Sequence, residues 1–263
     1  MVREDQLANV RKMVRQNSLE NARVITIVSG KGGVGKSNLS LNLSIALRES
    51  DRQVALFDAD THFSNIHLLS GAPEKGALAN VITGEKRLTQ LQVTEESGVN
   101  IISAPSDSET FDMSEEYIKE EFFHQIYRYK SSYDFVVIDT SASLSQTIID
   151  FSLLADDLIV IITPEPAAVS DGYAMIKVLN NIRDGMLFNV VINFVESKEE
   201  AEEVYERFSL VVEHFLGAEI NFLGFIREDR SVKDAITMQK PLLRVYPESK
   251  AAQCIKKIAG GIR

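Results

Sequence analysis

Residues 28–44 read VSGKGGVGKSNLSLNLS, and this stretch decides the fold. Within it, residues 30–37 satisfy the pattern G-x-x-x-x-G-K-[ST], directly after the apolar run VITIV and before a segment with helical character. Glycines allow backbone amides to approach phosphate oxygens, and a helix that starts here adds its positive end. Lys36 is expected to neutralise the β- and γ-phosphates of a nucleotide, and the Ser37 hydroxyl to bind Mg²⁺.

Short apolar runs recur along the rest of the chain, mostly without polar alternation. Such runs are typical of strands that are buried on both faces of a parallel sheet. Strands are predicted at 24–29, 54–60, 99–103, 134–140, 158–163, 188–194 and 222–226. Helices are predicted at 36–49, 114–130, 146–155, 169–184, 197–217, 231–239 and 248–260.

The alternation of strands and helices predicts a single-domain, doubly wound α/β fold, with a mostly parallel sheet and helices on both faces. We expect this domain to span residues 21–263. Residues 1–20 are polar and weakly helical, and we interpret them as a separate segment. In such sheets ligands bind at the carboxyl ends of strands, where the strand order reverses.

Composition excludes several classes of protein. The 263 residues carry a formal net charge of -10, which argues against binding to nucleic acid. The single cysteine cannot close an internal disulfide, the N-terminus is charged, and the apolar runs are too short to span a bilayer. We therefore expect a cytoplasmic protein.

Carboxylates end two of the predicted strands. Asp139 closes the run FVVID, as the magnesium-associated carboxylate does in phosphate-loop proteins, and we interpret Asp139 as part of a Mg²⁺ site with Ser37. Asp58 and Asp60 flank Ala59, and at strand spacing both would point to the same face. One of the two could orient an attacking water while the other holds structure.

The loop with its early lysine, followed by D-A-D at 58–60 and D-T at 139–140, resembles the deviant Walker A family of MinD/ParA-type ATPases. The resemblance implies an ATP-dependent homodimer with ATP or ADP and Mg²⁺ as ligands. It implies that Lys31 reaches across the dimer to the partner's nucleotide, and that Asp60 positions the water for slow hydrolysis. Lys31, Lys36 and Asp60 are thus the expected catalytic residues, and Asn65 fits the first switch.

Nucleotide contacts also follow from the loop and the resemblance. Asn193, at a strand end, fits the residue that reads the adenine edge, and LGFIREDRSVKDAITMQKPL at 223–242 fits the loop that packs on the base. Arg227 stands where relatives usually carry proline. The expected contacts are Gly30, Lys31, Gly32, Gly33, Val34, Gly35, Lys36, Ser37, Asn38, Asn193, Arg227 and Asp229.

Three stretches resemble the FlhG branch of that family, the regulators of flagellar number and placement. They are TPEPAAVSDGYAMIK at 163–177, YPESKAAQCIKKIA at 246–259 and DQLANVR at 5–11. The resemblance implies that Asp5, Gln6 and Arg11 bind an FlhF-like, signal-recognition-type GTPase. It also suggests flagellar switch or C-ring components as partners.

Two features leave alternatives open. Ser141 and Ser143 follow Asp139 where relatives carry glycine or proline, which should stiffen this second switch. The helix predicted at 248–260 could lie on lipid, although packing on the sheet is favoured. A MinD- or ParA-type regulator of division or partition, and a non-catalytic module that uses nucleotide as a structural ligand, remain the alternative functions.

Overall fold

We describe the chain from a computed structural model, which defines residues 22–60, 65–73, 85–103, 125–126, 129, 132–142, 144–183 and 185–262. Within these ranges the strands form one eight-stranded sheet. The strands are β1 (Arg23–Val28), β2 (Val54–Asp58), β3 (Val93–Thr94), β4 (Asn100–Ser103), β5 (Phe135–Asp139), β6 (Asp157–Ile162), β7 (Phe188–Val195) and β8 (Ile220–Arg227). The predicted single-domain, doubly wound α/β fold is confirmed.

Strand β1 lies at the point in the sheet where the order of strand addition reverses. The order is β3-β4-β2-β5-β1-β6-β7-β8, and every pair is parallel except β3 with β4. The strands that follow β1 in the sequence, β2 and β4, lie on one side of it. The strands that follow β5, namely β6, β7 and β8, lie on the other side. The loops that follow β1, β2 and β5 therefore open at one edge, beside the reversal.

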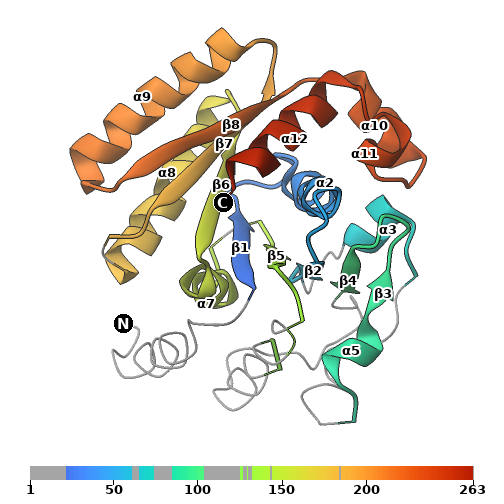
Figure 1. Ribbon diagram of the computed structural model, residues 1–263. Coiled ribbons are helices and arrows are strands. Elements are labelled where there is room, and N and C mark those ends of the chain that lie inside the picture. Colours follow the sequence, from blue (N-terminus) through green and yellow to red (C-terminus); the bar gives the residue numbers. More distant parts are fainter. Residues whose placement is uncertain are drawn as a thin grey trace.

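Helices cover both faces of the sheet (Figure 1). On one face lie α2 (Lys36–Arg48), α10 (Arg230–Thr237), α11 (Leu242–Val245) and α12 (Lys250–Gly261), with α3 (Ile66–Ser70) beside α2. On the other face lie α7 (Gln146–Leu154), α8 (Pro166–Ile182) and α9 (Lys198–Leu216). The short helix α5 (Leu88–Leu91) precedes β3. None of the helices in the described ranges is both long and apolar enough to cross a membrane.

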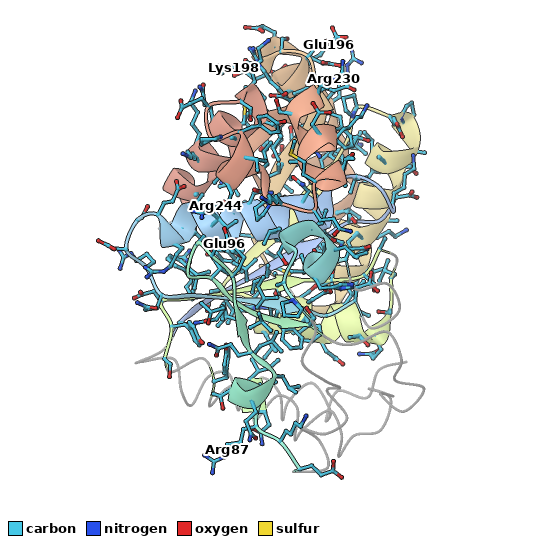
Figure 2. All side chains as sticks on the ribbon, turned by 90° about the vertical axis from the view of Figure 1, so that its right-hand side faces the viewer. Arg87, Glu96, Glu196, Lys198, Arg230 and Arg244 are labelled. Carbon is cyan, nitrogen blue, oxygen red and sulfur yellow. The ribbon has the colours of Figure 1, made fainter. Side chains whose placement is uncertain are left out.

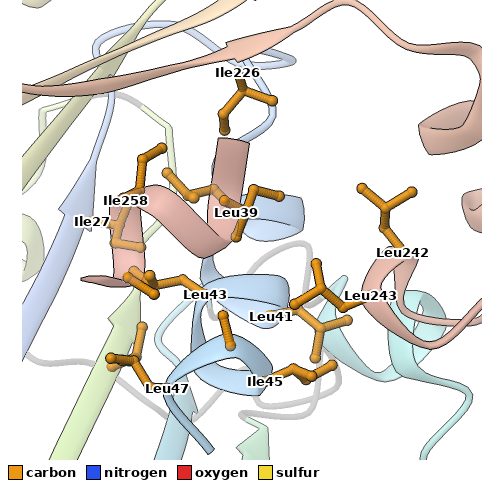
Figure 3. Packing of buried hydrophobic residues seen from close by; sticks show 14 of the residues in the cluster. Ile27, Leu39, Leu41, Leu43, Ile45, Leu47, Ile226, Leu242, Leu243 and Ile258 are labelled. Carbon is orange, nitrogen blue, oxygen red and sulfur yellow. The ribbon is translucent and has the colours of Figure 1, made fainter. Parts of the chain in front are cut away.

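Helix α2 is buried on every side, although its sequence alternates between polar and apolar residues. Figure 3 shows its leucines between the sheet, α12 and α11. The polar positions between them find partners: Ser44 Oγ donates to the Ser40 carbonyl at 2.7 Å, and Asn42 Oδ1 accepts from Leu243 N at 3.0 Å. Because these buried polar groups are satisfied, the helix tolerates complete burial.

The apolar side of α12 packs inside the protein. Ala251, Ile255 and Ile258 are each at most 1% exposed, against α2 and β8. These residues cannot contact lipid in this conformation, so the favoured interpretation of 248–260, a last helix packed on the sheet, agrees with the structure.

On the same side of the fold, Arg244 of α11 pairs with Glu96 at 3.3 Å (Figure 2).

Most element boundaries agree with the sequence, and one difference concerns the site. The strand predicted at 54–60 ends at Asp58, because the buried Asp58 carboxylate accepts backbone hydrogen bonds from Asp60 and Ile66 and turns the chain. The short elements β3, α3, α5 and α11 were not predicted, since two to five residues show no periodicity. The helix predicted at 114–130 lies largely outside the described residues, as do residues 1–20.

Candidate functional site

The loop between β1 and α2 has the backbone geometry that its glycines predict. Gly33 and Gly35 have positive φ angles, 79° and 91°, in the left-handed region that favours glycine. A Cβ on Gly30 would collide with the backbone carbonyl of Asp171, and a Cβ on Gly35 with the side-chain amide of Asn193. The loop is therefore held tightly between α8 and the end of β7.

In the described part of the chain, the N-terminus of α2 has no side-chain cap, unlike those of four other helices. Among the described residues, side chains cap α7, α9, α10 and α12, namely Ser145, Ser197, Asp229 and Ser249. Helix α2 instead begins after Gly35, and no described side chain caps it. Its first backbone N–H groups are thus available to an anion, and the helix dipole favours negative charge there.

Lys36 and Asp139 form a buried ion pair behind the loop. Lys36 Nζ lies 3.1 Å from Asp139 Oδ1 and also contacts the Thr140 carbonyl oxygen, and the two side chains are 7% and 1% exposed. Ser40 Oγ lies 2.8 Å from the same carboxylate oxygen. Asp139 Oδ2 is buried and has no hydrogen-bond partner among the described residues. A buried carboxylate oxygen without a partner fits a Mg²⁺ site that Asp139 shares with Ser37.

Asp58 and Asp60 have different surroundings, in contrast to the expected shared face. Asp58 is completely buried, and its carboxylate accepts from Asp60 N at 3.1 Å and from Ile66 N at 3.2 Å. Asp58 therefore holds the turn after β2. Asp60 is partly exposed and lines the cavity beside the loop, as does Asn65.

Lys31 pairs within its own chain. Its Nζ lies 2.5 Å from Glu165 Oε2, at the start of α8, and the two side chains are 39% and 65% exposed. Ion pairs this exposed contribute little to stability, because water screens the charges. Lys31 is consequently held at the rim of the cavity by a contact that is easily exchanged.

The ends of β7 and β8 form the other wall. Asn193 donates from Nδ2 to the Val34 carbonyl at 2.7 Å, so it ties β7 to the loop. Asp229 accepts from Ser231 N at 2.9 Å and from Ala251 N at 3.2 Å, and so joins the starts of α10 and α12. Burial by itself raises the pKa of Asp229, but these backbone hydrogen bonds hold that pKa below its ordinary value.

One cavity, of about 1010 Å³, joins the two walls. It is lined by Lys31, Gly32, Gly33, Val34, Gly35, Lys36, Ser37, Asn38, Asp60, Asn193, Arg227 and Asp229. Of the remaining predicted site residues, Gly30 lies behind the loop against α8, and Asp139 lies beneath Lys36. Asp5, Gln6, Arg11 and Ser143 lie outside the described residues.

Comparison with known families identifies the chain. Residues 25–242 match the CobQ/CobB/MinD/ParA nucleotide binding domain. The chain belongs to this family. The predicted MinD/ParA membership is confirmed.

Relatives in this family share most of the chain. The antiactivator FleN of Pseudomonas aeruginosa is 30% identical over 94% of this chain and 88% of its own length. The flagellum site-determining protein YlxH of Helicobacter pylori is 30% identical over 91% of this chain and 81% of its own. The chain is thus similar to FleN and YlxH, the branch of the MinD/ParA family that the sequence predicted.

Solved structures of the same family have the same fold. MinD of Pyrococcus horikoshii, complexed with Mg-ADP, aligns with a TM-score of 0.72 and 27% identity, over 90% of this chain and 94% of that one. MinD of Pyrococcus furiosus aligns with a TM-score of 0.74 and 24% identity, over 92% and 98% of the two chains.

Three residues of the candidate site were not predicted from the sequence. Ser40 contacts Asp139, Glu165 pairs with Lys31, and Phe194 lines the cavity beside Asn193. Ser40 and Glu165 are common polar residues at positions without a motif, so no local signal marks them. An aromatic residue directly after the strand-end asparagine is a signal that could have identified Phe194.

Proposed function

We propose that the chain is an ATP-dependent molecular switch that dimerises around ATP and Mg²⁺ and hydrolyses ATP slowly. One observation carries the proposal: the uncapped N-terminus of α2 opens into the same cavity as Lys36, Asp60 and Lys31. Backbone donors, a buried cation and a partly exposed carboxylate are the groups that phosphoryl transfer to water requires.

The chain's own residues hold the phosphates. Amides of the loop and of the first turn of α2 donate to phosphate oxygens, and Lys36 neutralises the charge at the β- and γ-positions. Ser37 and Asp139 are the residues that would hold Mg²⁺, and the Asp139 Oδ2 atom, which has no hydrogen-bond partner among the described residues, would serve as a ligand. The metal ion supplies neutralisation of charge that develops on the phosphates.

Asp60 orients the attacking water in this proposal. Its neighbour Asp58 is fully engaged with backbone amides, which leaves Asp60 as the carboxylate of the pair that faces the cavity. Asn65 lines the same region and fits the first switch. Ser141, in place of a glycine, restricts the backbone of the second switch, which is consistent with slow turnover.

Lys31 exchanges partners in the proposed cycle. In the single chain it pairs with Glu165, and in the ATP dimer it contacts the nucleotide that the partner subunit holds. The exposed ion pair with Glu165 is weak enough for a triphosphate to displace. This exchange gives the early lysine of the loop a function that depends on ATP.

The proposed biological role is control of flagellar number and placement. FleN and YlxH, both 30% identical to this chain, support this role. Asp5, Gln6 and Arg11 are the proposed contacts to an FlhF-like GTPase, and flagellar switch or C-ring components are the proposed targets. Flagella can be counted after the chain is expressed in a bacterium that lacks its own FlhG, with Asp60→Ala as the control.

Light scattering tests the switch directly. Solution mass is measured with ADP and with ATP plus Mg²⁺ for the wild type, Asp60→Ala and Lys31→Ala. We expect a monomer with ADP, a dimer with ATP that Asp60→Ala traps, and nucleotide binding without a dimer for Lys31→Ala. A stable ATP dimer of Lys31→Ala would remove the lysine from the interface, and a monomer under every condition would refute the switch.

A non-catalytic nucleotide module is the second candidate. Thr140 Oγ1 donates to the Ile27 carbonyl at 2.9 Å, which fixes the start of the second switch to β1 and favours a static site. Measurement of phosphate release over many turnovers separates the two candidates. Only the switch should release phosphate continuously, and Asp60→Ala should abolish that release. Liposome co-sedimentation and DNA retention test the MinD- and ParA-type alternatives.

A further inference from the structure

Phe194 has an unusual backbone conformation at the wall of the cavity. Its φ is 59°, in the left-handed region, and it is the only exposed residue of β7, all of whose residues are described. The register between β7 and β8 shifts here: Asn193 faces Ile226 and Val195 faces Arg227, so Phe194 is the extra residue of a β-bulge. Glycine would occupy such a position without strain.

The strained backbone conformation indicates that the Phe194 side chain has a functional role. Residues with a Cβ disfavour the left-handed region, and a bulge at the end of a strand re-aims one side chain. The conformation is held by Asn193, whose Oδ1 accepts from Phe194 N at 2.9 Å while its Nδ2 donates to the Val34 carbonyl at 2.7 Å. One asparagine thus fixes the bulge and the phosphate loop to each other.

The bulge directs the Phe194 ring into the cavity. The tip of the ring, Cζ, lies 3.6 Å from the position that a Cβ on Gly35 would take, so the ring reaches the phosphate loop. Phe194 is 40% exposed and lines the cavity together with Arg227 and Asp229. An apolar ring that is left this exposed at a buried strand end has a face free for a planar ligand.

We propose that Phe194 supplies the aromatic face on which the base of the bound nucleotide stacks. This inference rests on the proposed function, since it assigns the base position within the same site. Stacking depends on the π-face that all bases share, so Phe194 contributes affinity rather than a choice between bases. Discrimination is left to hydrogen-bonding groups at the same wall, such as Arg227.

The test compares a ligand that has a base with one that does not. Affinities of wild type and Phe194→Ala are measured for ADP and for inorganic tripolyphosphate. We expect Phe194→Ala to weaken ADP binding roughly 5- to 100-fold and tripolyphosphate binding less than about twofold. ADP is the probe because the proposed dimer requires ATP, so a change in ADP affinity cannot arise from subunit contact.

Matched variants control for folding and for the loss of any aromatic ring. Phe215 on α9 is 68% exposed, and we expect Phe215→Ala, which removes its ring, to leave ADP affinity unchanged. Phe194→Leu keeps an apolar side chain without a π-face and should lose most of the stacking. The chain contains no tryptophan, so Phe194→Trp introduces a single reporter whose fluorescence ADP should quench and tripolyphosphate should not.

The outcomes separate this inference from the proposed function. Equal ADP affinity of wild type and Phe194→Ala overturns the stacking role and leaves the switch intact. Equal losses for ADP and tripolyphosphate also overturn it, because they would mean that Phe194 supports the loop. A wild type that binds neither ligand refutes the nucleotide site itself. Selective loss of ADP affinity, with quenching at Trp in Phe194→Trp, establishes the stacking face.

Discussion

The phosphate wall of the cavity is contiguous in sequence, whereas the base wall is assembled from distant segments. Residues 30–38 form the first wall almost alone, and their conformation follows from glycine φ angles and a helix start. The second wall combines the ends of β7 and β8 with the start of α10. A contiguous wall is encoded by a motif, while an assembled wall depends on strand order.

Lys36→Ala should damage the phosphate wall most. Nucleotide affinity should fall roughly 100-fold or more, since hydrogen bonds to charged groups contribute about 1.5–3 kcal/mol each. The buried Asp139 charge loses its partner, so the free energy of unfolding should fall by about 3–5 kcal/mol. Isothermal titration with ADP and urea unfolding measure the two effects. The double variant Lys36→Ala/Asp139→Ala should recover part of the stability, and no recovery would contradict the pairing.

Asn193→Ala breaks the connection between the two walls. It leaves the buried Val34 carbonyl without its hydrogen bond, which should cost about 1–3 kcal/mol of stability and weaken ADP binding. Asn189→Ala is the control, because Asn189 lies near the start of β7 and pairs with Asn221. Urea unfolding should show losses for both variants, and ADP titration a loss for Asn193→Ala alone. Equal ADP affinities would mean that the walls are independent.

Asp229→Ala tests the base wall alone. The cap of α10 should contribute about 1 kcal/mol, measured by urea unfolding at several pH values. Because the pKa of Asp229 lies below its ordinary value of 3.8, its charged form stabilises the fold above that value. This stabilisation is lost as pH falls through the lowered pKa. The difference in the free energy of unfolding between wild type and Asp229→Ala should therefore become smaller at acid pH. For Ser249→Ala, which removes the cap of α12, the difference in the free energy of unfolding from wild type should not change with pH in this way.

Glu165→Gln should have the smallest effect. It removes the charge that pairs with Lys31, so Lys31 is released for the proposed ATP dimer, which should tighten by at most about fivefold. Analytical ultracentrifugation with ATP measures the shift at low salt, where exposed charges interact most strongly. Glu202→Gln, which breaks the exposed pair with Lys198 on α9, is the control. A weaker dimer for Glu165→Gln would show that Glu165 aids closure.

The contrast between the walls also explains which parts the sequence could predict. Helix α2 alternates like a strand, yet its preceding glycines and lysine identify a helix start, and the prediction of a helix at 36–49 agrees with the structure. Asp58 and Asp60 show the opposite case. Their spacing predicted a shared face, but Asp58 turns the chain by accepting the amide of Ile66, eight residues away. Nothing in the local pattern indicates that hydrogen bond.

By itself the sequence determined the phosphate loop, the parallel sheet and the family, because glycine φ angles, a helix start and strand burial are requirements of a few adjacent residues. Only the tertiary structure decided which groups meet across the chain. Lys36 pairs with Asp139 across 103 positions, and Asn193 with Val34 across 159. The left-handed bulge that turns Phe194 toward the loop is likewise set by β8 and Asn193, not by Phe194 itself. Such contacts arise from strand order, which no single segment contains.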